Sequence, residues 1–157
     1  MGLIIGAVAA AVVSKKIIPT AFFKRPCQDL SRPEKFGLSN TTNHRIPLAK
    51  SEESLGAWLV KPSGGHQWNI DFKDEVAILY LHGNIATRSY GHRLGLYKVF
   101  QDIGLSTLTV DYRGFGDSSF LFSPTEHTMT EDAIAAFLWL KAGLFLSLLP
   151  QLKKSGP

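Results

Sequence analysis

His82, Gly83 and Asn84 directly follow the apolar run "VAILYL" at 76–81, and this order of residues suits one kind of chemistry. A glycine lets the backbone turn sharply and approach a ligand closely. The N–H that follows Gly83 can then point at negative charge developing on a substrate oxygen, and one such donor contributes about 3–4 kcal/mol. The residues therefore suit half of an oxyanion hole. The alternative is a tight strand-to-helix turn whose histidine bonds to the backbone.

A second glycine-rich turn, "DYRGFGDS" at 111–118, contains Gly114 and Gly116. Asp111 and Arg113 either pair with each other or tie this loop to its neighbours, and we interpret Asp111 as a structural residue. A phosphate-binding G-x-G-x-x-G fingerprint needs a third glycine. The stretch "GFGDSS" has none, so nucleotide binding is not indicated.

If the turn after 76–81 holds an oxyanion, a serine nucleophile should accompany it, and one common setting for such a serine is a G-x-S-x-G turn. Three serines follow a Gly-x pair, but the final glycine is replaced in each case, by Thr41, Leu108 and Phe120. The sequence therefore contains no such turn. In enzymes that use such a turn, the acid and the histidine of the catalytic triad follow the serine along the chain. We accordingly expect none of the histidines at 82, 92 and 127 to be a catalytic base.

The histidines also do not predict a metal site, because no two of them lie three to five residues apart. No cofactor motif stands elsewhere in the chain, so neither a metal nor a cofactor is expected. An enzyme of a different chemistry therefore finds little support, since the sequence places no pair of carboxylates together either.

Apolar runs and helical patterns alternate along the middle of the chain. A continuous apolar run is typical of a strand buried on both faces, and β-branched residues favour strands. Strand, helix, strand, helix indicates an α/β fold whose parallel strands are joined by crossover helices. The earlier strands are expected to form an antiparallel edge. The predicted strands cover 44–49, 55–60, 76–81 and 106–112, and the predicted helices 89–104 and 128–141.

The first predicted helix places Leu94, Tyr97 and Phe100 on one face, and Gly104 is a natural residue at its end. In the second, Thr128 and Glu131 have capping-box spacing. After residue 141 the amphipathic pattern decays into the apolar and basic stretch 142–157, which does not resemble the strand expected next.

The net charge of +4 is concentrated at the two ends of the chain, and residues 51–141 carry more acidic than basic side chains. A nucleic-acid-binding face on the body is therefore not expected.

Residues 1–27 combine an apolar run with basic residues, which suits a membrane surface. Three interpretations stay open for this segment: a membrane anchor, a cleaved signal, or an apolar stretch from a misassigned start. The single cysteine, Cys27, indicates no disulfide.

The two turns together, with "DLSRPEKFGLSNTTN" (29–43), "HRLGLYKVFQDIGL" (92–105) and "TMTEDAIAAFLWLK" (128–141), carry a resemblance. The chain resembles the α/β-hydrolase domain-containing lipases of the endoplasmic reticulum membrane, over about residues 28–141. The resemblance implies the front half of a serine-hydrolase sheet. It also implies lysophospholipids or monoacylglycerols as the substrate class, and a body on the lumenal side.

The resemblance also assigns roles to residues. Asn84, and Ile85 next to it, supply an oxyanion N–H. His82 and Gly83 shape that turn, and Arg113, Gly114, Gly116 and Asp117 shape the loop beside the active site. Asn40, in the sequon "NTT", is an expected glycosylation site.

The resemblance ends at Lys141, before the expected nucleophile. We therefore expect a truncated isoform or gene-model fragment of a serine lipase, with residues 28–141 as a partial hydrolase domain and no catalytic triad. Such a chain should be inactive. The alternative is a non-catalytic product that binds or regulates a full-length lipase.

Overall fold

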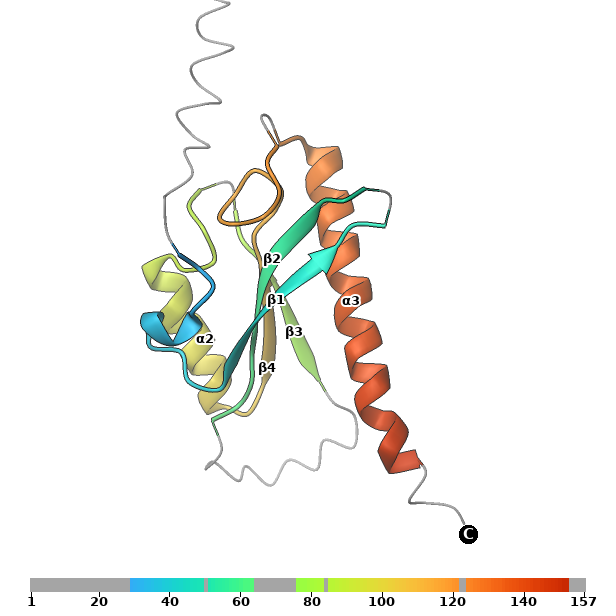
Figure 1. The fold of residues 1–157 in the computed structure, drawn as a ribbon. Helices are drawn as coiled ribbons and strands as arrows, with labels where there is room; N and C mark the ends of the chain where they lie inside the picture. The colour runs from blue at the N-terminus through green and yellow to red at the C-terminus, as the bar shows by residue number, and fades with distance from the viewer. Residues whose placement is uncertain (1–28, 50, 64–75, 84, 122–123, 153–157) are drawn as a thin grey trace, which may run out of the picture.

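The computed structural model describes residues 29–49, 51–63, 76–83, 85–121 and 124–152, with side chains up to residue 143 (Figure 1). The expected N-terminal segment 1–27 lies outside the described residues, and so does Asn84.

Four strands form one mixed sheet in the order β1-β2-β4-β3. The first two strands pair antiparallel, as do β2 and β4, whereas β3 and β4 run parallel. This confirms the predicted α/β class with an antiparallel edge followed by parallel strands. The strands are β1 (Thr41–Pro47), β2 (Ser54–Val60), β3 (Ala77–Leu81) and β4 (Ser106–Val110).

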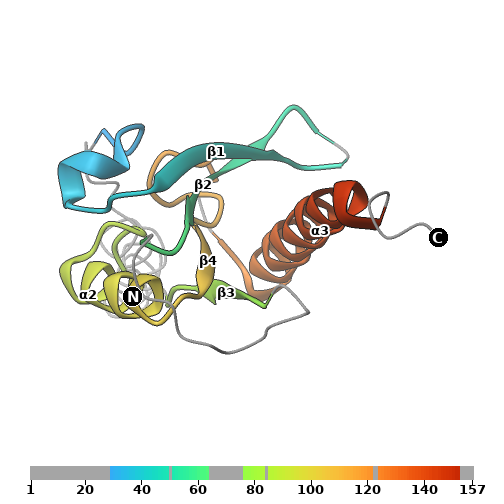
Figure 2. The same ribbon diagram turned by 90° about the horizontal axis from the view of Figure 1, so that it is seen from below.

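Helices cover both faces of the sheet. The α2 helix (Gly91–Asp102) lies on one face and the α3 helix (Glu126–Leu152) on the other, which is clearest when the sheet is viewed from below (Figure 2). A short 3₁₀ helix, η1 (Pro33–Phe36), precedes β1. Within the described sheet β3 is an edge strand, so its outer side has no neighbouring strand there.

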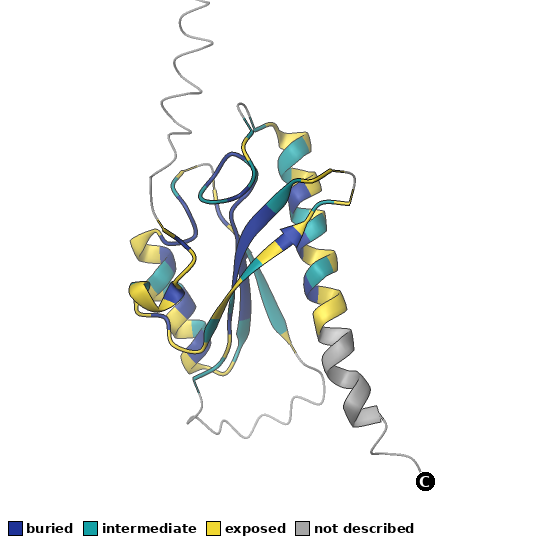
Figure 3. Ribbon diagram, viewed as in Figure 1, coloured by how far each residue is buried: buried dark blue, intermediate teal, exposed yellow. Residues whose placement is uncertain are grey.

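The core divides into two clusters, because successive residues of a strand point to opposite faces. Leu55 and Ala57 of β2 pack toward α3, whereas Trp58 and Val60 pack toward α2 and η1. The central strands β2 and β4 are the most buried elements (Figure 3). Trp58 is fully buried, and its indole N–H donates to the carbonyl of Leu30 at 2.8 Å.

The buried face of α2 is more polar than predicted. Arg93, Tyr97 and Gln101 are buried, at four-residue spacing, whereas Leu94 and Phe100 are only half-buried. The amphipathic prediction found Tyr97 but missed the two polar residues, because it counted only apolar side chains. The predicted end of the helix is confirmed: Gly104 has φ +84°, and the N–H of the next residue bonds back into the last turn.

The start of α3 corrects one prediction. The helix begins at Glu126, and Thr125 caps it: the Thr125 hydroxyl accepts from the N–H of Thr128 at 3.2 Å, and the Thr128 hydroxyl accepts from the N–H of Thr125 at 2.8 Å. The proposed pair Thr128–Glu131 is therefore wrong. Two short hydroxyl side chains close the first turn, and Glu131 forms an ion pair with Arg113.

The end of α3 differs from the expected decay after residue 141, since the helix continues to Leu152. Residues 144–149 are rich in leucine, which has high helix propensity, and the loss of a polar face does not itself break a helix. No helix among the described residues is both long enough and apolar enough to cross a bilayer.

Candidate functional site

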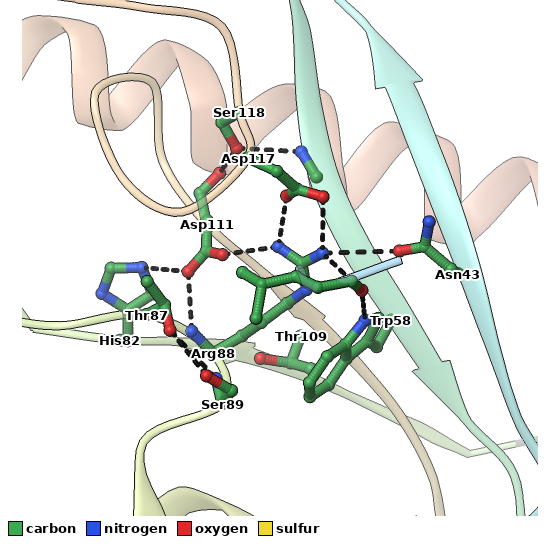
Figure 4. A network of polar contacts seen from close by, with 12 residues as sticks. Asn43, Trp58, His82, Thr87, Arg88, Ser89, Thr109, Asp111, Asp117 and Ser118 are labelled. Carbon is green, nitrogen blue, oxygen red and sulfur yellow. Dashed lines mark hydrogen bonds and ion pairs between the residues drawn. The ribbon is translucent and has the colours of Figure 1, made fainter. Parts of the chain in front are cut away.

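A fully buried arginine, Arg88, joins the two glycine-rich turns (Figure 4). It comes from the turn after β3, and both its carboxylate partners come from the loop after β4. Its backbone N–H donates to Asp111 Oδ1 at 2.7 Å and its Nη1 to Asp111 Oδ2 at 2.5 Å. The same guanidinium donates to both oxygens of Asp117, at 2.7 and 3.1 Å. Two carboxylates thus compensate one buried cation, as burial of charge requires.

The guanidinium also reaches the antiparallel part of the fold. Its Nη2 lies 3.4 Å from Asn43 Oδ1 of β1 and 3.5 Å from the carbonyl of Leu30. Its Cζ lies 4.9 Å from the centre of the Trp58 ring, within the range of a cation–π contact. A single side chain therefore connects both turns with β1, β2 and the segment before η1. We name Arg88, Asp111 and Asp117 the arginine cluster.

His82 adjoins the arginine cluster and is buried. Its Nδ1 lies 2.5 Å from the carbonyl of Gly83, and because a carbonyl only accepts, Nδ1 carries the proton of that bond. Its Nε2 lies 3.1 Å from Asp111 Oδ1, but not in hydrogen-bond alignment. The rings of Tyr112 and Phe115 stand edge-on at 5.1 Å. The histidine is thus bonded to the backbone of the turn.

The ionisation of Asp117 is coupled to the arginines around it. Burial on its own would raise the pKa of Asp117, but the hydrogen bonds and charge of Arg88, with the charge of Arg45, outweigh burial and hold this pKa below its usual range. Arg45 also donates to the backbone carbonyl of Asp117. The carboxylate form of Asp117 is therefore favoured in the folded protein.

Small residues let the loop after β4 pack against the sheet. A Cβ on Gly56 would overlap the Asp117 carboxylate, and a Cβ on Gly116 would overlap that of Asp111. Gly116 also has φ +49°, and Gly114 has φ +86°, conformations that favour glycine. The Ser118 hydroxyl donates to the Asp111 carbonyl at 2.5 Å and accepts from the Gly56 N–H at 2.8 Å.

Arg113 does not pair with Asp111; it ties the loop to its neighbours, the second alternative drawn from the sequence. It contacts Asp132 at 2.7 Å, Glu131 at 2.8 Å and Glu53 at 2.9 Å. Burial raises the pKa of Asp132 despite the nearby guanidinium. Arg113 thus links the loop to α3 and to the start of β2, on the side away from the arginine cluster.

The expected oxyanion turn is only partly described. Ile85 is exposed, and the Asn84 assignment lies outside the described residues. The next residue, Ala86, has φ +60°, a left-handed conformation that costs energy for a residue with a Cβ. The Arg93 guanidinium donates to the carbonyls of Ile85 and Thr87, each at 2.6 Å.

The sequence interpretation missed two arginines of this site, Arg88 and Arg93. An arginine in a polar loop is normally exposed, so neither was singled out. One feature of the sequence could have predicted a buried arginine. Asp111 and Asp117 flank a glycine-rich loop packed against a buried sheet, and two carboxylates in such a place need a cation.

Within the described residues, no group of three or more His, Cys, Asp or Glu side chains gathers as a metal site.

Replacing Arg88 by methionine should lower the free energy of unfolding by about 3–5 kcal/mol, because the buried Asp111 and the half-buried Asp117 would lose their shared cation. Equilibrium unfolding in urea measures this. Arg32→Met is the matched control: Arg32 is exposed, so its loss should stay within about 0.5 kcal/mol. Equal losses in the two variants would contradict the role of the cluster.

The stabilising effect of the Asp117 carboxylate should be lost in acid. Its folded pKa lies below its unfolded value of about 3.9, so the effect is complete above that pH and disappears as pH falls through the folded pKa. The stability difference between the wild type and Asp117→Asn should therefore shrink as pH is lowered from 7 toward 3. Asp132 has a raised pKa, so its contribution to stability changes with pH in the opposite direction. Both proteins contain Asp132, and its contribution therefore cancels in the difference between them. A constant difference across this range would argue against the coupling.

Comparison with known proteins places this geometry in context. No protein-family model matches the chain. It is 40% identical to the lysophosphatidylserine lipase ABHD12 of Gallus gallus over 126 residues, which is 73% of this chain and 32% of the relative. The Xenopus tropicalis lysophosphatidylserine lipase ABHD12 is also 40% identical, over 73% of this chain and 31% of its own length. Protein ABHD12B of Homo sapiens is 38% identical over 77% of this chain and 35% of its own length.

The fold is similar to that of a solved enzyme. An esterase of Pyrococcus furiosus superposes with a TM-score of 0.56 and 18% identity, over 75% of this chain and 40% of the esterase. The chain spans about a third of the length of the curated relatives it matches. By sequence the chain is therefore a homologue of the ABHD12 proteins, and its fold matches part of an esterase that has the α/β-hydrolase fold.

Proposed function

We propose that the chain carries the oxyanion part of a serine ester hydrolase that acts on lysophospholipids or monoacylglycerols. The observation that carries this proposal is the arginine cluster, which fixes the turn after β3 against the loop after β4. Both turns lie at the carboxyl ends of parallel strands, where open α/β sheets bind their ligands. The relatives named lysophosphatidylserine lipases support the substrate class.

The 157-residue polypeptide itself is proposed to be catalytically inactive. Its sequence has no G-x-S-x-G turn, so the usual nucleophile of this architecture is missing from it. Without the triad, an enzyme of this class keeps only the residual rate that the oxyanion hole and binding supply.

A groove beside β3 suits this interpretation. It has a volume of about 630 Å³ and lies between β3 and α3, lined by apolar side chains that include Leu79, Leu81, Ile134 and Phe137. Leu81, Ile134 and Phe137 are exposed, and β3 is the edge strand of the described sheet. Further elements of a complete hydrolase domain would cover this groove. The same open edge is the one feature that favours the second candidate, a non-catalytic chain that binds a full-length lipase.

The purified chain should not react with a fluorophosphonate probe, and it should not release fatty acid from lysophosphatidylserine or monoacylglycerol. Mass spectrometry of the labelled protein measures the first, and a fatty-acid release assay the second. Labelling of one serine at one equivalent per chain would contradict the assigned inactivity. Co-purification with an active lipase, without labelling of this chain, would favour the second candidate.

We further propose that the chain associates with the endoplasmic reticulum membrane through its N-terminal segment, with its body in the lumen. Asn40 is exposed at a turn with φ +49°, directly before β1, where a glycan would meet no core residue. Its Nδ2 donates to the carbonyl of Pro62 at 2.6 Å, and the second hydrogen on that nitrogen is the one a glycan would replace.

Expression with microsomes should therefore give a chain that is heavier by one glycan, removable by endoglycosidase H. Asn40→Gln should abolish the shift, and Asn43→Gln, in the same segment but outside the sequon, should keep it. A chain that stays protease-accessible and unglycosylated in microsomes would contradict the lumenal placement.

A further inference from the structure

Three large apolar side chains are exposed at one edge of the sheet. Ile85 and Tyr90 belong to the connection between β3 and α2, and Phe120 belongs to the loop after β4; they are 57%, 51% and 67% exposed. Both connections lie at the carboxyl ends of the parallel strands, at the upper end of the sheet in Figure 1. The Ser119 N–H donates to the carbonyl of Ser54, the first residue of β2, at 2.9 Å, which holds the chain next to Phe120 at this edge. We call these three side chains the apolar rim.

The described chain enters the domain at the same edge. The Leu30 carbonyl lies 3.5 Å from Arg88 Nη2, in the turn after β3. A Cβ on Gly116, in the loop after β4, would lie 3.1 Å from Leu30 Cδ1. Leu30 therefore lies between the two turns, and the preceding residue, Asp29, is exposed. Residues 1–28 are thus attached to the domain beside the apolar rim.

We propose that the apolar rim faces the lipid bilayer with which residues 1–28 associate. A single exposed apolar side chain is ordinary, but several at one edge mark an interaction surface. The attachment at Leu30 keeps this edge, and no other, next to the membrane. The tyrosine of the rim suits this position, because its ring is apolar and its hydroxyl can stay at the level of the lipid headgroups. The inference rests on the proposed membrane association and deepens it.

The proposed glycosylation site fits the same orientation. Asn40 directly precedes β1, whose first residue, Thr41, pairs with Val60 at the end of β2. Because β2 begins at the edge that carries the rim and has seven residues, its far end lies about 20 Å away. A glycan on Asn40 would therefore lie on the side of the domain away from the bilayer.

Two other exposed apolar side chains provide matched controls. Val99 of α2 is 53% exposed, and Phe137 of α3 is 52% exposed. Both helices begin at the edge that carries the rim and run away from it. At 1.5 Å per residue, Val99 lies about 12 Å along α2 from Gly91, and Phe137 about 16 Å along α3 from Glu126. Apolar groups at a membrane surface are buried only about 5–10 Å deep, so a bilayer that contacts the rim should not reach the controls.

The test places one nitroxide label at a time on the full 157-residue chain, reconstituted with phosphatidylcholine vesicles. Cys27→Ser removes the single native cysteine, and the labelled variants are Ile85→Cys, Phe120→Cys, Val99→Cys and Phe137→Cys. Oxygen concentrates in the bilayer and a nickel chelate in water, so the ratio of their collision rates reports where each label lies. Addition of vesicles should raise this ratio several-fold at positions 85 and 120 and leave it unchanged at 99 and 137.

A chain that binds the vesicles while all four labels stay in water would overturn the inference and leave the membrane association standing. A ratio that rises at 99 or 137 instead of at the rim would also overturn it, because another face would then contact lipid. A chain that does not bind the vesicles would overturn both proposals. Dipolar broadening between labels of different copies at 85 and 120, before vesicles are added, would assign the rim to a second copy and contradict the inference. If one rim variant does not fold, the other decides by the same ratio.

Discussion

The burial of one positive charge organises this structure. Arg88 is fully buried, and moving an unpaired charge out of water would cost more than a small domain can compensate. Asp111 and Asp117 must therefore come to it from the loop after β4. That requirement explains why glycines stand at 56 and 116, where any side chain would displace one of these carboxylates. The carboxylates and the glycine of this loop are therefore explained by the buried guanidinium of Arg88.

Side chains also fix the backbone of the turn after β3. The turn after β3 is held at its start by His82, which bonds to the Gly83 carbonyl, and at its end by Arg93, which bonds to the carbonyls of Ile85 and Thr87. Between these points its backbone is held in a conformation that Ala86 would not adopt alone. Under the proposed function, a turn fixed in this way would need little further ordering to bind an anion, which is the physical basis of electrostatic preorganisation.

The sheet could be predicted from the sequence because its signals are local. The apolar run before His82 and the β-branched run before Asp111 became neighbouring parallel strands, and Gly104 ended α2. The site could be predicted only in outline. His82-Gly83 marked the turn, but nothing in the spacing from Arg88 to Asp117 shows that these residues meet, since their contact depends on how two loops pack after the sheet forms.

The arginine cluster is expected to make the two turns one cooperative unit. Native-state hydrogen exchange of the 157-residue chain tests it most directly, because it resolves which segments open together. Residues 85–90 and 111–118 should open in a single event, with the same free energy and the same denaturant dependence, together with β4. Opening of 85–90 at a much lower free energy, while 111–118 stays protected, would contradict it.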